Sequence, residues 1–68
     1  MKIFCDRFKE LRKDKGLSAV DLAGKLGVRD STIIRWENGV MLPRIDQLVK
    51  ICLFFRVSPG YLLGLEDY

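Results

Sequence analysis

Residues 27–39 read Gly27-Val28-Arg29-Asp30-Ser31-Thr32-Ile33-Ile34-Arg35-Trp36-Glu37-Asn38-Gly39. The stretch begins and ends on glycine, and a glycine just past a helix end can take the left-handed conformation that closes the last turn. We therefore read Gly27 as the end of one helix and Asn38-Gly39 as the end of the next. A short helix over about residues 30–38 is predicted between them.

The predicted helix has two unlike faces. At about 100° per residue, Ile33 and Trp36 share one face, whereas Ser31, Ile34 and Arg35 point the other way. The two large apolar residues can anchor the helix in a core. The hydroxyl and the guanidinium then face outward, so the helix is held still while its far side touches a partner.

Glu37 is the exception on the inner face. It lies close in angle to Ile33, so its carboxylate should be partly covered. A buried carboxylate needs a cation and hydrogen bonds. We expect another part of the chain to supply that cation.

A first helix is predicted over about residues 2–15, with Phe4, Phe8 and Leu11 at helical spacing on its inward face. Gly16 stops it.

A second helix starts at Ser18, its N-cap, and Asp21 stands three residues later in the capping-box position. It ends at Gly27, only a few residues before the next helix. Two helices joined this tightly, with a glycine at the corner, form a helix-turn-helix.

Two further helices are predicted after Gly39. One runs over about residues 44–55, and its core side is formed by Ile45, Leu48, Ile51, Cys52 and Phe55. The other has Ser58 as its cap and Pro59 at its first position, and it ends at Gly64. No strand alternation or hairpin turn is visible. The sequence therefore predicts an all-α fold of five short helices in a single domain, residues 1–68.

The 68-residue chain carries a net charge of +3 and contains no histidine. A small basic domain fits nucleic acid or an anionic surface, although this charge is also common in proteins that bind neither. Cys5 and Cys52 are too few and too far apart for a zinc site, and they read as free thiols of a cytoplasmic protein. There is no secretory segment and no run long enough to span a bilayer. We expect no membrane association, no metal and no cofactor.

Motifs from about Phe8 to Leu65 closely resemble the XRE family, the phage repressor and Cro-type helix-turn-helix domains. They are Leu17-Ser18, Asp21-Leu22-Ala23, Leu26-Gly27-Val28, Ser31-Thr32-Ile33, Arg35-Trp36-Glu37-Asn38-Gly39, Pro43, Val57-Ser58-Pro59 and Leu62-Leu63-Gly64. The run Arg-Trp-Glu-Asn-Gly after Ser-Thr-Ile is a specific signal. The resemblance implies a compact, lambda repressor-like bundle of five helices whose third helix lies in the major groove of double-stranded DNA.

The resemblance also implies roles for single residues, position by position. The candidates for base edges are Arg29, Asp30, Ser31 and Arg35. The candidates for the DNA backbone are Ser18 and Ala19 at the start of the second helix, Asn38, the amide of Gly39, and Arg44. Arg12 matches the position whose arginine pairs with the glutamate of the third helix, here Glu37. Ala19 stands where the family often has glutamine.

The chemistry of the outward residues leaves alternatives open. Arg35 can fork onto O6 and N7 of guanine, or stay solvated beside Glu37 or Asp30. Ser31 can donate to a base or phosphate, or stabilise its own first turn. Asp30 can accept from cytosine N4, but an acid in a first turn already interacts with the helix dipole. Ile34 can meet a thymine methyl group, or a partner protein.

Apolar residues near the end of the fourth predicted helix lie off its core side. Such surface is a liability in a monomer, so either the fifth helix covers it or a second subunit does. A domain this small reads only a few base pairs, so specificity needs two copies about one helical turn apart. We therefore predict a homodimer, at least on DNA, whose interface residues are Leu53, Phe54, Val57, Pro59 and Tyr61.

Two functions remain from the sequence. The favoured one is a sequence-specific transcriptional regulator, a repressor, that binds DNA as a dimer and has no small-molecule effector domain. The alternative is a protein-interaction module with the same fold, such as an antitoxin-like subunit. Asp30, Ile34 and the missing glutamine at Ala19 slightly favour the alternative. The basic charge favours DNA, as do Arg29, Arg35, Arg44 and Asn38. We expect no enzyme activity, because the chain lacks histidine, paired carboxylates in a cleft and a phosphate-cradling glycine loop.

Overall fold

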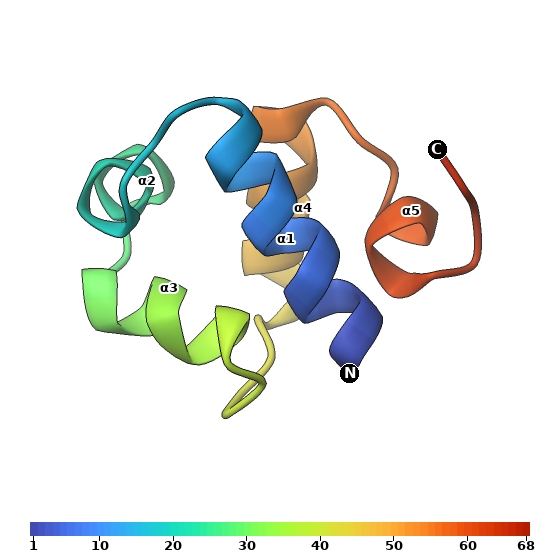
Figure 1. The fold of residues 1–68 in the computed structure, drawn as a ribbon, viewed down its shortest axis with the longest axis horizontal. Coiled ribbons are helices and arrows are strands. Elements are labelled where there is room, and N and C mark those ends of the chain that lie inside the picture. The colour runs from blue at the N-terminus through green and yellow to red at the C-terminus, as the bar shows by residue number, and fades with distance from the viewer.

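The computed structural model describes residues 1–68 and contains five helices and no strand (Figure 1). The helices are α1 (Lys2–Asp14), α2 (Ala19–Leu26), α3 (Asp30–Glu37), α4 (Ile45–Phe55) and α5 (Pro59–Leu63). The predicted all-α fold of five helices is therefore confirmed. None of the helices is both long enough and apolar enough to cross a membrane.

The core is built around α1, which crosses the middle of the molecule in Figure 1, with α2 and α3 to one side and α5 to the other. The Phe8 ring on α1 meets Trp36 of α3 and Phe55 of α4 edge-on, with centroids 5.7 and 6.2 Å apart. It also stacks on Phe4 at 5.5 Å. Edge-to-face and offset pairs add to the stability gained from burial. Phe8 therefore ties three helices together.

The two predicted serine caps are present. The Ser18 hydroxyl accepts from the Asp21 amide at 3.0 Å, and the Asp21 carboxylate accepts from the Ser18 amide at 3.2 Å, which completes a capping box. The Ser58 hydroxyl accepts from the Tyr61 amide at 3.0 Å, with Pro59 at the first helical position. These caps satisfy amides that a helix leaves unpaired at its start.

Helix α5 and the residues after it are fixed to α1. Gly64 has φ +81°, and a Cβ there would lie 2.9 Å from the Ile3 Cδ1 atom, so this close approach requires glycine. The Arg7 guanidinium lies 4.4 Å from the centroid of the Tyr61 ring and donates to the carbonyl oxygens of Tyr61 and Glu66. One arginine thus ties both α5 and the segment after it to α1.

The prediction that Ile45 lies on the core side of α4 is wrong, because this side chain is 79% exposed. Ile51, Cys52 and Phe55 are buried as predicted. Ile45 instead begins an outward stripe with Val49 and Leu53, spaced one helical turn apart. Because a domain of this size has too few elements to cover every side of α4, the stripe stays exposed.

Candidate nucleic-acid interface

Helix α3 is anchored by the two apolar residues that the sequence placed on its inner face. Ile33 and Trp36 are fully buried. The Trp36 indole nitrogen has no hydrogen-bond partner, so the ring is held by packing alone. This anchoring fixes the position of α3 and leaves its opposite side free.

The Glu37 carboxylate is nearly covered, and Arg12 of α1 is its partner. Arg12 Nε lies 2.6 Å from Glu37 Oε2 and Nη2 lies 3.1 Å from Oε1, which is a bidentate pair. The hydrogen bond to Glu37 raises the pKa of the Arg12 guanidinium above its ordinary value, so it stays charged at neutral pH. Arg12 also donates to the Leu17 carbonyl oxygen at 2.8 Å. The arginine therefore joins α1, the loop before α2 and the end of α3.

The turn between α2 and α3 is short and closed by its own backbone. Gly27 has φ +70°, and its amide and that of Val28 both donate to the Ala23 carbonyl oxygen. Val28 is half-buried against the core. Arg29 then returns to an extended conformation as the N-cap of α3. The turn thus holds the two helices in a fixed relative position, as a helix-turn-helix requires.

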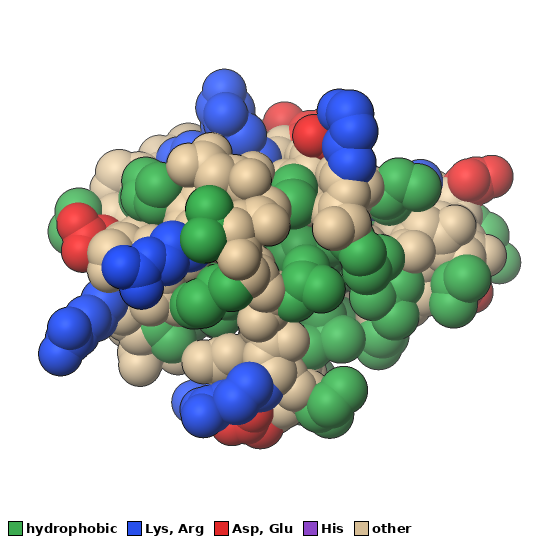
Figure 2. Space-filling model, turned by 90° about the horizontal axis from the view of Figure 1, so that it is seen from below, with side chains coloured by type: hydrophobic (Ala, Val, Ile, Leu, Met, Phe, Trp, Pro, Cys, Tyr) green, Lys and Arg blue, Asp and Glu red, His purple; other side chains and the backbone are tan.

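The side of α3 opposite the core is exposed over its full length. All five predicted base-reading residues lie there or at its N-cap: Arg29, Asp30, Ser31, Ile34 and Arg35. Figure 2 views the molecule from below Figure 1, so α3 lies toward its left; basic and acidic side chains project around the edge, and hydrophobic atoms gather at the centre and right. The structure thus brings the predicted base-reading set together on one surface.

Two members of this set have features that limit their roles. The Asp30 Oδ1 atom accepts from the Ser31 amide at 2.9 Å, so this carboxylate already stabilises the first turn of α3. Ile34 is 47% exposed and gives the surface an apolar centre. The guanidinium groups of Arg29 and Arg35 have no carboxylate within 4.0 Å, so both can bind a partner.

The predicted backbone-contact residues stand at two places beside α3. At the start of α2, the Ser18 hydroxyl accepts one bond from Asp21 and keeps its own proton to donate. Ala19 offers only its amide, one of the donors that a helix leaves unpaired in its first turn.

Beyond the end of α3 stand the other three backbone candidates. Asn38 is exposed and its side chain makes no hydrogen bond within the chain, whereas the Gly39 amide already donates weakly to Trp36 at 3.4 Å. Arg44 caps α4 and lies 3.5 Å from Asp46, with both side chains well exposed. Such an exposed pair is weak, so Arg44 can exchange Asp46 for a phosphate.

The predicted dimer residues are only partly brought together. Leu53, Val57 and Pro59 line one open hollow beside α4. Phe54 packs against the core with Lys15 over its ring, and Tyr61 is covered by Arg7. The last two aromatic rings are therefore largely used inside the molecule.

Sequence reasoning missed an apolar cleft between the first turn of α1, the start of α4 and α5. It measures ≈ 160 Å³ and is lined by Met1, Phe4, Leu42, Pro43, Ile45, Leu48 and Leu63. We call it the α1–α4–α5 cleft. The apolar loop before α4 was the available signal, but the sequence did not indicate which elements it would meet.

A model of helix-turn-helix domains matches residues 8–62 of this chain. The chain belongs to the helix-turn-helix family. This match covers the anchored α3, the Gly27 turn and the Arg12–Glu37 pair, and it confirms the XRE-type resemblance.

Several curated relatives share the domain. The uncharacterized HTH-type transcriptional regulator YobD of Bacillus subtilis (strain 168) is 35% identical over 65 residues, 96% of this chain and 58% of YobD. The HTH-type transcriptional regulator AnsR of the same organism is 36% identical over 90% of this chain and 53% of AnsR. The HTH-type transcriptional activator BcrR of Enterococcus faecalis is 34% identical over 94% of this chain and 31% of BcrR. The chain thus spans between about a third and three fifths of these relatives, and no solved structure matches it.

Proposed function

We propose that this chain is the DNA-binding part of a transcriptional regulator and that α3 enters the major groove of double-stranded DNA. One observation carries the proposal: α3 is locked on its inner face by Ile33, Trp36 and the Glu37–Arg12 pair, while its outer face is bare and carries two unpaired arginines. A recognition helix needs this combination, because base readout depends on side chains held at a fixed register in the groove. Relatives named as transcriptional regulators support the same role.

The outer face divides into readers and supports. We propose that Arg35 reads guanine through its planar fork, with Arg29 and Ser31 as secondary readers. Ile34 fits a thymine methyl group. Asp30 is committed to the first turn of α3 and acts mainly by excluding bases that offer only acceptors at that position.

Backbone contacts flank the readers on both sides. Ser18 and the amide of Ala19 bind phosphate at the start of α2, while Asn38, Gly39 and Arg44 bind the backbone beyond the end of α3. Phosphate contacts fix register and carry no sequence information by themselves. Ser18 can keep its cap while it donates its hydroxyl proton, so the two roles do not compete.

We propose that two copies bind together on one paired site. The domain measures 28 Å along its longest axis, less than one DNA turn of about 34 Å, so two copies fit on successive major grooves. For their contact we favour the α1–α4–α5 cleft over the predicted Leu53 surface. The cleft lies next to Arg44, which forms an opposite-sign pair with Asp46, and two copies can bring this pair together without repulsion.

The regulatory outcome follows from occupancy. A pair of copies on promoter DNA blocks access to it without any further activity, so we propose repression as the role and the cytoplasm as the place of action. The relative BcrR is named an activator, so domains of this kind also occur in proteins with the opposite role.

Selection from a random duplex library tests the proposal. The protein is mixed with the library at low salt, bound duplexes are recovered and amplified, and the enriched sequences are compared. We expect two related half-sites about one helical turn apart, with a guanine in each that is lost when Arg35→Ala is selected in parallel. Recovery of unenriched sequences by the parent protein would contradict the proposal.

A further inference from the structure

The outward side of α4 carries an apolar ridge that nothing in the molecule covers. Val49 is 50% exposed and Leu53 is 73% exposed, one helical turn apart. Among the other apolar residues of this half of the helix, Ile51, Cys52 and Phe55 are buried and Phe54 is half-buried. The ridge is therefore surplus to the core.

Two hollows lie on either side of the ridge. One, of ≈ 380 Å³, lies between the last turn of α2 and α4 and is bordered by Lys25, Lys50 and Phe54. The other, of ≈ 590 Å³, lies between α4 and the start of α5. Leu53 lines both hollows, so they form one continuous surface, which we call the α4 face.

The charged side chains that line the α4 face all have one sign. Lys25 and Lys50 line the first hollow, Arg56 lines the second, and the Lys15 ammonium lies 5.5 Å from the centroid of the Phe54 ring. Neither hollow is lined by an acidic residue. None of the four cations takes part in any of the ion pairs of the chain.

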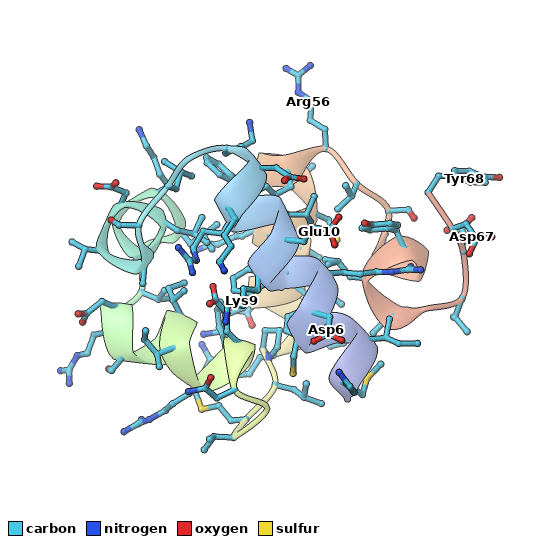
Figure 3. All side chains as sticks on the ribbon, in the orientation of Figure 1. Asp6, Lys9, Glu10, Arg56, Asp67 and Tyr68 are labelled. Atoms are coloured by element: carbon cyan, nitrogen blue, oxygen red, sulfur yellow. The ribbon has the colours of Figure 1, made fainter.

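Arg56 is held in an unfavourable backbone conformation at the rim of this face. It caps α4 with φ +57° and ψ +48°, the left-handed region that favours glycine. Its side chain extends away from the body of the molecule (Figure 3). The chain thus keeps an exposed guanidinium at a position where glycine would be less strained.

A second copy of this chain does not suit the α4 face. In a two-fold pair the same patch is buried on both copies. Because three cations and no acid line the patch, with Lys15 beside it over the Phe54 ring, such a pairing would bring cations toward cations. Like charges brought together at an interface oppose association.

We propose that the α4 face binds an acidic amphipathic helix of a partner protein. Apolar side chains of that helix, spaced along one face, would fill the hollows on either side of Leu53. Its aspartates or glutamates would meet Lys25, Lys50 and Arg56, which orient it along α4. Burial of apolar side chains in the hollows provides affinity, and the cations provide specificity for an acidic partner over a basic one.

The probe is a synthetic helix of about 18 residues with leucines along one face and glutamates beside them. A matched peptide has lysine in place of every glutamate. Binding to the ¹⁵N-labelled chain is measured by fluorescence anisotropy and located by amide chemical shifts. We expect the acidic peptide to bind saturably and to shift amides of residues 24–27 and 49–57, and the basic peptide to bind at least about tenfold more weakly.

Charge reversal sharpens the test. Lys25→Glu combined with Lys50→Glu should weaken binding of the acidic peptide by about tenfold and strengthen binding of the basic peptide. The control is Lys9→Glu with Lys13→Glu, an equal change of net charge in a hollow on α1 that also contains Asp6, Glu10 and Asp14. Equal losses in both double variants would overturn the proposal, as would shifts confined to α3 or the absence of saturable binding.

Two further outcomes identify a different occupant. Competition between the acidic peptide and a DNA duplex at the α4 face would assign that face to DNA. Self-association of the free chain that disappears in Leu53→Glu would assign it to a second copy. Either result overturns the proposal, and neither depends on whether α3 reads bases.

Discussion

At the scale of single residues, the Arg12–Glu37 pair decides where α3 sits. Arg12 is the only side chain that binds the Glu37 carboxylate, and it also holds the Leu17 carbonyl oxygen. We expect Arg12→Ala to lower the free energy of unfolding by about 3–5 kcal/mol, because it leaves a buried carboxylate without a partner. Urea unfolding followed by circular dichroism measures this.

The matched variants separate charge from packing. Replacing both partners, as in Arg12→Met with Glu37→Leu, should lower the free energy of unfolding by less than the sum of the two single changes. Neither charge is then buried without a partner. Arg12→Lys should rescue only in part, because an ammonium cannot make the bidentate contact. A loss below about 1 kcal/mol for Arg12→Ala would mean that water already satisfies Glu37.

The sequence predicts the Arg12–Glu37 pair but not the contact of Arg12 with Leu17. The angle between Ile33 and Glu37 indicated a covered carboxylate, and the family resemblance pointed to Arg12. The hydrogen bond from Arg12 to the Leu17 carbonyl oxygen cannot be predicted from the sequence. It depends on the backbone path of the loop after Gly16, which side-chain spacing does not determine.

At the scale of helices, sequence patterns predict where the helices begin and end, but they wrongly place the exposed Ile45 side chain in the core. Ser18 with Asp21, and Ser58 with Pro59, gave the caps that the structure has. Ile45 was placed in the core because helical spacing identifies apolar residues on one side, whereas burial depends on whether another element reaches that side.

Helix α4 ends on Arg56, whose backbone conformation leads to a prediction about stability. Arg56 occupies the left-handed cap position with φ +57°, which costs a non-glycine residue about 1–2 kcal/mol. We expect Arg56→Gly to raise the free energy of unfolding by about 1 kcal/mol, while Arg56→Ala, which keeps the Cβ, gives no such gain. Thermal unfolding compares the three proteins. A lower melting temperature for Arg56→Gly would mean that its guanidinium stabilises the fold.

At the scale of the whole molecule, the question is how two copies meet. If the α1–α4–α5 cleft forms the contact, Ile45→Glu should abolish cooperative binding to a duplex with two half-sites. Binding to a single half-site, which reports any direct effect of the new charge on DNA, should change much less. Leu53→Glu is the matched control, since it puts the same charge on the same helix at an equally exposed position.

Binding isotherms on the two duplexes, with sedimentation of the complexes, decide between these surfaces. Loss of cooperativity in Leu53→Glu with none in Ile45→Glu would move the contact to the α4 face. That result would restore the interface predicted from the sequence and would contradict both the cleft proposal and the acidic-partner proposal.

We propose that Arg35 reads a base while Arg44 binds the DNA backbone, and one set of titrations separates these two roles. The parent, Arg35→Ala and Arg44→Ala are titrated with the selected duplex and a scrambled one across several salt concentrations. We predict that Arg35→Ala makes the binding free energy less favourable by about 1–3 kcal/mol for the selected duplex and changes it little for the scrambled one. Arg44→Ala should weaken both alike and reduce the salt slope by about one unit per copy. Equal weakening of binding to both duplexes by Arg35→Ala would show that Arg35 reads no base, and a parent protein that binds neither duplex at low salt would show that α3 does not bind DNA.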